Sequence, residues 1–353
     1  MVGGTDGYAG IEIEAPDHSI QSLAPPDHQQ RFEGIAFAPS GNTIGVATSD
    51  TNTVFLFRRK PDGLFEEAPY SSISGPASGM NYPHDLSFSS AGGVELLAVA
   101  QRTGSICVYQ KNKTAEDYGS HPVFEIRGRK AKLSFSDGVA FVPPDDEYLA
   151  ACSLNLSRIT FYRRTSGPSV GFTLEPVSEL KHRSVRKPDG LAFSQCGEWL
   201  AVANHGIHTV SVYQRRSAVS SKRQIEYGPA PVAIIKDPGF RHPHSVAFTP
   251  KTHHLVVTNA GANYFGVYQP QWDGFEMRWS QSPVLQKVVG PESTFRQVNS
   301  RNKMEGGPKG LAIHQNNLAV CGPEFGIRIY SFRENTLGGE RPRDATPLAL
   351  LRS

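Results

Sequence analysis

The chain of 353 residues has little of several features that would place it in a narrow class. Its four cysteines form no CxxC pair and lie in different repeats, which excludes a disulfide framework. The formal net charge is only +3, from 36 Lys and Arg against 33 Asp and Glu, which does not predict a nucleic-acid partner. No apolar run approaches membrane-spanning length, and the first residues lack the basic and apolar regions of a signal peptide. We therefore expect a cytoplasmic protein with no membrane or nucleic-acid partner.

Helical periodicity is also missing, and a motif repeated six times stands in its place. Each copy has three short runs of β-branched and aromatic residues separated by Gly, Pro, Asn and Asp, which is typical of strands joined by tight turns. The aromatic residues that close the third runs are Phe57, Tyr109, Tyr162, Tyr213, Tyr268 and Tyr330. Their intervals of 52, 53, 51, 55 and 62 residues indicate a repeat architecture.

A fourth, weaker run follows most copies, at Pro122, Pro231, Pro283 and Thr346. The sequence thus predicts an all-β fold, a six-bladed β-propeller of four-stranded antiparallel blades around a central channel. We expect one domain over residues 1–353, with blades from about residues 31, 82, 135, 187, 242 and 307. Residues 1–30 are predicted to include a strand that pairs with the last blade and latches the ring. A seven-bladed ring and two packed sandwiches are the alternatives.

The residue two positions before the apolar-Ala-aromatic triplet of the first run is ionisable in every repeat. These residues are Glu33, His84, Asp137, Asp189, His244 and Lys309. Because innermost strands start at the same channel mouth, we expect all six side chains to converge there. Three carboxylates and one ammonium give the ring a formal charge of −2 with neutral His, which is costly in a partly desolvated site. A bound divalent cation would compensate this charge, and so would Lys309 together with protonated His.

A second polar ring is predicted where the second strands end at the same mouth. Its members are Thr48, Gln101, Ser153, Asn204, Asn259 and Gly322, with Arg102 and His205 among the neighbouring loop residues. These side chains suit hydrogen bonding to a small-molecule ligand. The longest insert, Gly290 to Gly307, precedes the sixth innermost strand and suits a lid over the mouth.

A purely structural interpretation of the ionisable ring stands beside the functional one. Asp-Gly is common turn chemistry, because Asp caps its own backbone and Gly tolerates positive φ, so Asp137-Gly138 and Asp189-Gly190 are also explained as turns. His84 and His244 follow proline, and a hydrogen bond to a carbonyl of a neighbouring blade would account for them.

The patterns HPHSVAF from His242, LAVAN from Leu200 and TVSVY from Thr209 resemble NHL-type and lactonase-like propellers. The ring resembles that of six-bladed calcium-dependent hydrolases: gluconolactonases of the regucalcin type, paraoxonases and squid-type phosphotriesterases. This resemblance implies a metal site with Glu33, Asp137 and Asp189 as ligands, and it relates His84 to the second-blade channel histidine of paraoxonases. His244 stands where such hydrolases have Asp, and Lys309 enters the same mouth. Calcium prefers oxygen ligands, whereas His together with carboxylates suits Zn²⁺, Mn²⁺ or Fe²⁺ better, so the sequence leaves the choice among these four metals open.

Three functions follow as hypotheses. The first is a metal-assisted, lactonase-like or esterase-like hydrolase, with Glu33, Asp137, Asp189 and His244 as metal ligands and His84, His244 and Lys309 as catalytic residues. Its substrate-binding residues would be Gln101, Arg102, Ser153, Asn204 and Asn259. The second is a metal-free lyase or cyclase similar to strictosidine-synthase-like propellers, in which Glu33 or Asp137 transfers the proton and Lys309 is the charge partner. The third is a non-catalytic scaffold that binds a protein or small molecule on the channel face.

Overall fold

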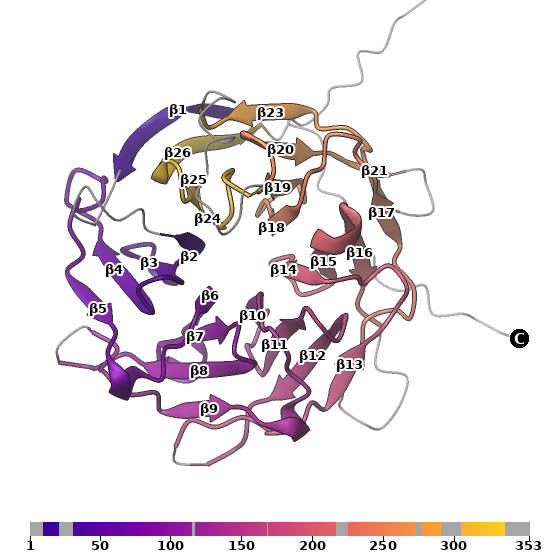
Figure 1. Ribbon diagram of the computed structural model, residues 1–353. Coiled ribbons are helices and arrows are strands. Elements are labelled where there is room, and N and C mark those ends of the chain that lie inside the picture. The colour runs from indigo at the N-terminus through magenta and orange to yellow at the C-terminus, as the bar shows by residue number, and fades with distance from the viewer. Residues whose placement is uncertain are drawn as a thin grey trace, which may run out of the picture.

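The computed structural model describes residues 10–20, 31–114, 117–167, 169–216, 225–272, 277–290 and 305–335. These residues form a ring of six antiparallel four-stranded sheets, so the predicted six-bladed propeller is confirmed (Figure 1). In each blade the first strand lies at the centre of the ring, and the following strands lie progressively farther out. The seven-bladed ring and the two sandwiches are thereby excluded for the described part of the chain.

The blades begin close to the predicted positions, and consecutive strands pair in the first four of them. The first three blades are β2 (Phe32–Phe37), β3 (Thr43–Thr48), β4 (Thr53–Arg58) and β5 (Ser71–Ile73); β6 (Pro83–Ser89), β7 (Leu96–Gln101), β8 (Ser105–Gln110) and β9 (Phe124–Ile126); and β10 (Val139–Val142), β11 (Tyr148–Ser153), β12 (Arg158–Arg163) and β13 (Ser178–Leu180). The last three are β14 (Pro188–Phe193), β15 (Trp199–Asn204), β16 (Thr209–Gln214) and β17 (Ala233–Ile235); β18 (Pro243–Phe248), β19 (Leu255–Asn259), β20 (Tyr264–Tyr268) and β23 (Leu285–Val288); and β24 (Leu311–His314), β25 (Asn317–Gly322), β26 (Gly326–Asn335) and β1 (Gly10–Ile20). In blade 5, β20 pairs with β23, and in blade 6, β26 pairs with β1.

The few other elements are small. A two-stranded hairpin, β21 (Pro270–Trp272) and β22 (Met277–Trp279), is inserted before the outer strand of blade 5. The 3-10 turns are η1 (Pro76–Ser78), η2 (Ala91–Gly93), η3 (Arg129–Ala131) and η4 (His205–Ile207). None of the described residues forms a helix with the length and apolarity that crossing a bilayer requires.

The predicted latch is β1, which supplies the outer strand of the last blade. It pairs antiparallel with β26 from Gly10 opposite Asn335 to Ile20 opposite Ile327, so the two ends of the ring are joined by one sheet (Figure 1). Ile11 and Ile13 pack against the apolar cluster between blades 5 and 6. The run from Thr346, which we expected as a further strand, lies outside the described residues.

The apolar core is divided among the interfaces between blades. Each of six clusters of buried residues combines side chains from two neighbouring blades, and the blades are therefore held by the packing of sheet on sheet around the ring. The aromatic residues that close the third strands are fully buried in these clusters. The hydroxyls of Tyr109 and Tyr162 donate to carbonyl oxygens of Ser78 and Ala131, in the segments that enter their own blades.

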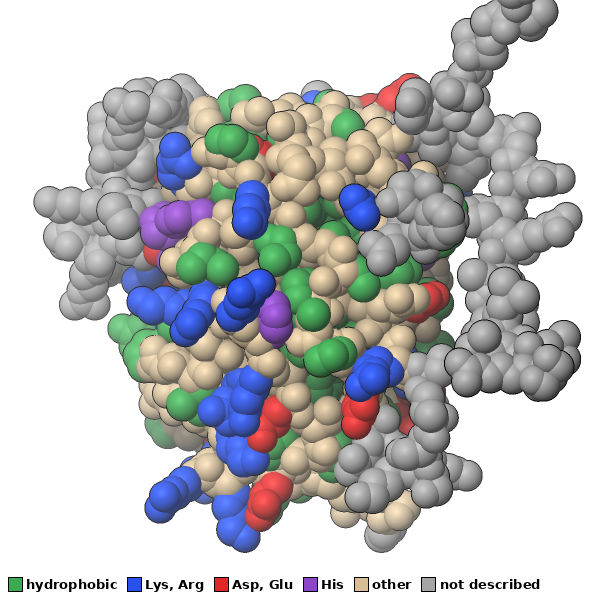
Figure 2. Space-filling view, turned by 90° about the vertical axis from the view of Figure 1, so that its right-hand side faces the viewer, with side chains coloured by type: hydrophobic (Ala, Val, Ile, Leu, Met, Phe, Trp, Pro, Cys, Tyr) green, Lys and Arg blue, Asp and Glu red, His purple; other side chains and the backbone are tan. Residues whose placement is uncertain are grey.

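In the side view of Figure 2, Lys and Arg side chains gather in a band down one side of the face, with hydrophobic side chains between them. The arginine pairs at third-strand ends illustrate the structural role of such charges. Arg59 donates to the Gly41 carbonyl and covers the Phe65 ring, and Arg164 donates to the carbonyl of Ala91. These contacts bind the ends of strands to neighbouring loops.

Candidate functional site at the channel mouth

The six predicted ionisable residues do converge at one end of the channel, and all of them are buried, with 0–2% of each residue exposed. Close approach of the innermost strands explains this burial. A Cβ added at Gly138 would lie 2.3 Å from the Asp189 carbonyl oxygen, and one at Gly190 would lie 2.5 Å from that of His244. Neither glycine has a positive φ. The interpretation of Asp137-Gly138 and Asp189-Gly190 as turns is therefore wrong, because these glycines allow neighbouring backbones to approach.

Lys309 and Glu33 form the shortest ion pair of this ring, with 2.6 Å between Nζ and Oε2. The other carboxylate oxygen of Glu33 accepts a hydrogen bond from Ser49 and lies 3.2 Å from the Arg31 guanidinium. Burial alone would raise the pKa of Glu33, but the Lys309 ammonium and the neighbouring imidazoles hold it well below its ordinary value. Glu33 is thus a carboxylate whose charge is already compensated.

Arg102 compensates a second carboxylate of the ring. Its Nε and Nη2 lie 3.1 and 3.4 Å from the two oxygens of Asp137, and Nη2 lies 3.0 Å from His84 Nε2. Desolvation, followed by the Arg102 charge, lowers the pKa of His84 to about 3. A neutral His84 then accepts from Arg102 through Nε2 and donates through Nδ1 to the Asp137 carbonyl, 3.2 Å away. The predicted structural role of His84, a bond to a neighbouring blade's carbonyl, is therefore observed.

Asp189 connects the buried ring to groups that solvent reaches. Its Oδ2 lies 3.2 Å from His205 Nδ1, and His205 Nε2 lies 3.2 Å from Glu305 Oε1. His205 and Glu305 are 16% and 11% exposed, against 2% for the Asp189 side chain. Desolvation opposes the charged form of His205, but the adjacent carboxylates of Asp189 and Glu305 raise its pKa to about 9. Glu305 also lies 3.6 Å from Lys309 Nζ, so the cluster and the ring are one network.

Asp137 and Asp189 have pKa values displaced in opposite directions. Burial raises the pKa of Asp137 to about 8, although Arg102 opposes this shift. For Asp189 the surrounding imidazoles outweigh the effect of burial, and its pKa is lowered. Two neighbouring carboxyls with divergent pKa values are a feature of acid–base sites.

The fit of a cation to Glu33, Asp137, Asp189 and His244 is poor in two respects. Lys309 already neutralises Glu33, and both oxygens of Asp137 already face the Arg102 guanidinium. Among the described residues, the buried sets whose donor atoms lie within 4.8 Å of one another are Glu33, His84 and His244, and His84, Asp137 and Asp189. The four predicted ligands do not form one such set, so cation binding by them remains a prediction. His244 stacks on His84, with 4.9 Å between ring centroids, and neither of its ring nitrogens has a hydrogen-bond partner among the described residues.

The second polar ring bonds to the protein's own backbone. Ser153 and Asn204 accept hydrogen bonds from the backbone N–H of Ser134 and Arg186, at 2.9 and 3.1 Å. Gln101 and Asn259 accept from Asn81 and Arg241 in the same way. Each donor lies three residues before the member of the ionisable ring in the same blade. The side chains of the second polar ring therefore fix the segment that enters the innermost strand. Their predicted contact with a substrate stays a prediction, and the observed contacts favour a structural role.

Sequence reasoning missed Glu305 and Arg31 and did not single out His242. Glu305 belongs to the insert predicted as a lid, but repeat alignment has no position for an inserted residue. Residues 291–304 of that insert lie outside the described residues. His242 Nδ1 lies 3.0 Å from His205 Nε2, and its backbone N–H donates to His208 Nδ1. The His-Pro dipeptide at the start of the innermost strand is the sequence signal from which His242 could have been predicted.

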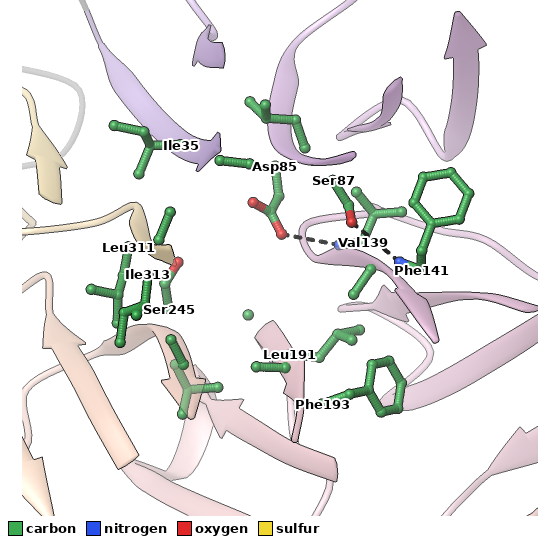
Figure 3. A pocket seen from close by; sticks show the side chains of 18 of the residues that line it. Ile35, Asp85, Ser87, Val139, Phe141, Leu191, Phe193, Ser245, Leu311 and Ile313 are labelled. Carbon is green, nitrogen blue, oxygen red and sulfur yellow. Dashed lines mark hydrogen bonds between the residues drawn. The ribbon is translucent and has the colours of Figure 1, made fainter. Parts of the chain in front are cut away.

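Beyond the ring, the channel widens into a cavity of about 240 Å³ lined by residues of all six innermost strands. Most of the side chains that line it are apolar, among them Ile35, Leu191 and Leu311 (Figure 3). Asp85 is its acidic group, and its Oδ2 accepts a hydrogen bond of 3.1 Å from the Val139 N–H (Figure 3). Burial raises the pKa of Asp85 to about 7.

Comparisons with known proteins agree with this fold. A family model described as "Lactonase, 7-bladed beta-propeller" matches residues 171–291, which cover blades 4 and 5. A comparison with curated proteins finds no match. Among solved structures, the β-propeller domain of Myceliophteria thermophila Cps50 (Swd1) is similar, with a TM-score of 0.52 and 13% identity over 85% of this chain and 83% of that chain. This chain is a six-bladed propeller with a lactonase-like segment. The structural likeness shows the fold alone.

Proposed function

We propose that the protein is a lactonase-like hydrolase that opens small anionic lactones or esters at the mouth of its channel. The observation that carries the proposal is the pair of Asp189 and His205, in which a buried carboxylate holds an accessible imidazole beside His242 and Glu305. A carboxylate that orients a histidine is a recurring element of sites that activate water. The segment that matches the lactonase family contains Asp189, His205 and His242.

Two arginines at the same mouth support an anionic substrate. The Arg31 and Arg102 side chains are 21% and 24% exposed, and each is fixed by a buried carboxylate, Glu33 and Asp137 respectively. A guanidinium held in this way binds carboxylate or phosphate oxygens and stabilises the negative charge that develops on a lactone carbonyl. His205, His242 and Glu305 would activate the attacking water. The buried ring below would hold the arginines and Asp189 in place.

The test is a screen of aliphatic, aromatic and sugar-acid lactones, with and without a carboxylate or phosphate group, followed by pH-indicator absorbance. We expect hydrolysis of at least one class, and a fall in kcat/KM of about 100-fold in His205→Gln, in the range that loss of a positioned acid–base group causes. His121→Gln, at an exposed histidine on the surface, is the matched control. The absence of any lactone or ester hydrolysis, or equal activity in His205→Gln and the control, would overturn the proposal.

A metal-free lyase or cyclase is the second candidate, and the divergent pKa values of Asp137 and Asp189 favour it. In that reaction the protonated Asp137 is the acid, Asp189 is the base, and Arg102 and Lys309 supply the positive charge. Turnover that adds no water to the product and is fully retained after exhaustive chelation would support this candidate over hydrolysis.

A binding scaffold is the third candidate. Tyr82, Phe135, Leu156 and Ile207 are 40–46% exposed and belong to loops at the mouth end of blades 2 to 4. Exposed apolar side chains among arginines are typical of protein interfaces. This candidate would be supported if neither hydrolysis nor elimination is found and Phe135→Ser abolishes capture of a stoichiometric partner.

A further inference from the structure

A second, more exposed group of metal-binding side chains lies above the buried ring, where blades 4, 5 and 6 meet. His205 is in η4 directly after β15, His242 directly precedes β18, and Glu305 lies before β24. The donor atoms are His205 Nε2, His242 Nδ1 and a carboxylate oxygen of Glu305, and all lie within 4.8 Å of one another. The three ligands come from three separate connections, so the folded ring is what brings them together.

Two of the three spacings between these atoms match a tetrahedral metal. Nitrogen and oxygen ligands bind Zn²⁺ at about 2.0–2.1 Å, which places two ligands of a tetrahedron about 3.3 Å apart. His205 Nε2 lies 3.0 Å from His242 Nδ1 and 3.2 Å from Glu305 Oε1. Without a metal, one N–H of His205 faces two acceptors at once. A cation in place of that proton would be bound by all three donors.

The surroundings of the group are those that orient metal ligands. Asp189 Oδ2 lies 3.2 Å from Nδ1 of His205, which leaves Nε2 directed toward the other ligands. Such a carboxylate–histidine–metal arrangement fixes the ring and strengthens the nitrogen as a ligand. Lys309 lies 3.6 Å from Oε2 of Glu305, so its contact is with the carboxylate oxygen that is not close to His205. The chain position of His242 is fixed by its backbone bond to His208.

We propose that His205, His242 and Glu305 bind one divalent transition metal of the zinc class, with Asp189 as the outer carboxylate and one coordination position open to a ligand. Two imidazoles and one carboxylate suit Zn²⁺, Co²⁺ or Mn²⁺, and Ca²⁺, which takes six to eight oxygens, is disfavoured. Partial exposure of His205 and Glu305 gives the metal a route from solvent, which the buried ring lacks. Three protein ligands and an open position are the arrangement of catalytic rather than structural zinc.

This site deepens the proposed function, because it names the group that activates water there, but metal binding can be measured without any substrate. The experiment uses full-length protein stripped with chelator and titrated with Co²⁺, whose visible absorption reports tetrahedral nitrogen and oxygen ligands, and then with Zn²⁺ by calorimetry. The variants are His242→Ala and the isosteric Glu305→Gln, with Asp189→Asn for the outer carboxylate. His121→Ala is the matched surface control, and Glu33→Gln reports on the buried ring. Circular dichroism checks that each variant is folded.

We expect one equivalent of metal in the wild type, His121→Ala and Glu33→Gln, and loss of the cobalt spectrum in His242→Ala and Glu305→Gln. Asp189→Asn should weaken binding by 10- to 100-fold. No stoichiometric binding, unchanged binding in folded His242→Ala and Glu305→Gln, or loss of binding in Glu33→Gln instead would overturn the site. Metal binding without lactone hydrolysis would keep the site and reject the proposed function, and lactone hydrolysis by a protein that binds no stoichiometric metal would do the reverse.

Discussion

Replacing Lys309 with methionine tests whether charge compensation holds the buried ring together. The Lys309 ammonium lies 2.6 Å from Glu33 Oε2, and both side chains are 1% exposed. Methionine keeps the length of the side chain and removes its charge. Glu33 then retains Arg31 at 3.2 Å and the Ser49 hydroxyl, both on its other oxygen. Removing one partner of a buried ion pair costs about 3–5 kcal/mol, and we expect Lys309→Met to lower the free energy of unfolding by that amount.

The interaction itself is isolated by a double-mutant cycle with Glu33→Gln. Because the double variant buries neither charge, it should lose less than the sum of the two single losses, by about 2 kcal/mol or more. Free energies come from guanidinium chloride unfolding, followed by both tryptophan fluorescence and far-ultraviolet circular dichroism so that coincident transitions justify a two-state fit. Losses that add within about 0.5 kcal/mol would refute the coupling. A loss below about 1 kcal/mol in Lys309→Met would refute the view that Glu33 depends on this ammonium.

Three further predictions concern the rest of the channel and the blades. The pKa of Asp85 is about 7 in the folded protein and 3.8 in the unfolded chain, so the protein is more stable below pH 4 than above pH 7, and the difference is lost as the pH rises from 4 to 7. The free energy of unfolding of Asp85→Asn should therefore exceed that of the wild type by up to about 4 kcal/mol at pH 8, because the pKa is raised by about three units at 1.36 kcal/mol each, and should not exceed it at pH 4. An equal difference at both pH values in chemical unfolding would contradict this. Gly190→Ala places a methyl group 2.5 Å from a backbone oxygen and should lower Tm strongly or prevent folding, whereas Gly167→Ala, with nothing within 4 Å, should not; equal melting curves would disprove the close approach. Tyr213→Phe removes a hydrogen bond of 2.6 Å between buried hydroxyls and should cost about 1–2 kcal/mol in the same unfolding assay, so an unchanged midpoint would count against that bond.

The fold was predictable because the same strand pattern occurs six times, so a weak copy can be identified from the clear ones. The six copies of one pattern identify the innermost strands, and the position two residues before each triplet locates the ionisable ring even where single repeats are degenerate. The closing strand was predictable in outline, since IEIEA alternates and a propeller ring is closed by joining its two ends. Its register with β26 depends on bulges between Ile13 and His18 that alternation does not reveal.

The candidate site was less predictable, because repeat alignment places only what repeats. It found Asp189 and flagged His205 as a loop neighbour, but Glu305 comes from an insert that only one blade has. It also counted ring charges without Arg31 and Arg102, which reach the ring from positions outside it. The expected charge of −2 is therefore compensated by side chains that the alignment did not place in the ring. The positions of the second polar ring at the ends of the second strands were predicted from the sequence. Its hydrogen bonds to backbone N–H groups were not, because they depend on loop conformations that the spacing of residues does not determine.

The pairing of Gly10–Ile20 with Gly326–Asn335 has a consequence for how the molecule assembles. During synthesis from the N-terminus, the strand made first must wait unpaired until more than 300 residues have followed it, while the five blades between have all their own strands. Sequence separations of this size slow folding, and an unpaired strand edge is open to other chains in the meantime. We expect the last blade to be the place where folding finishes, because its outer strand lies so far in the chain from its other strands.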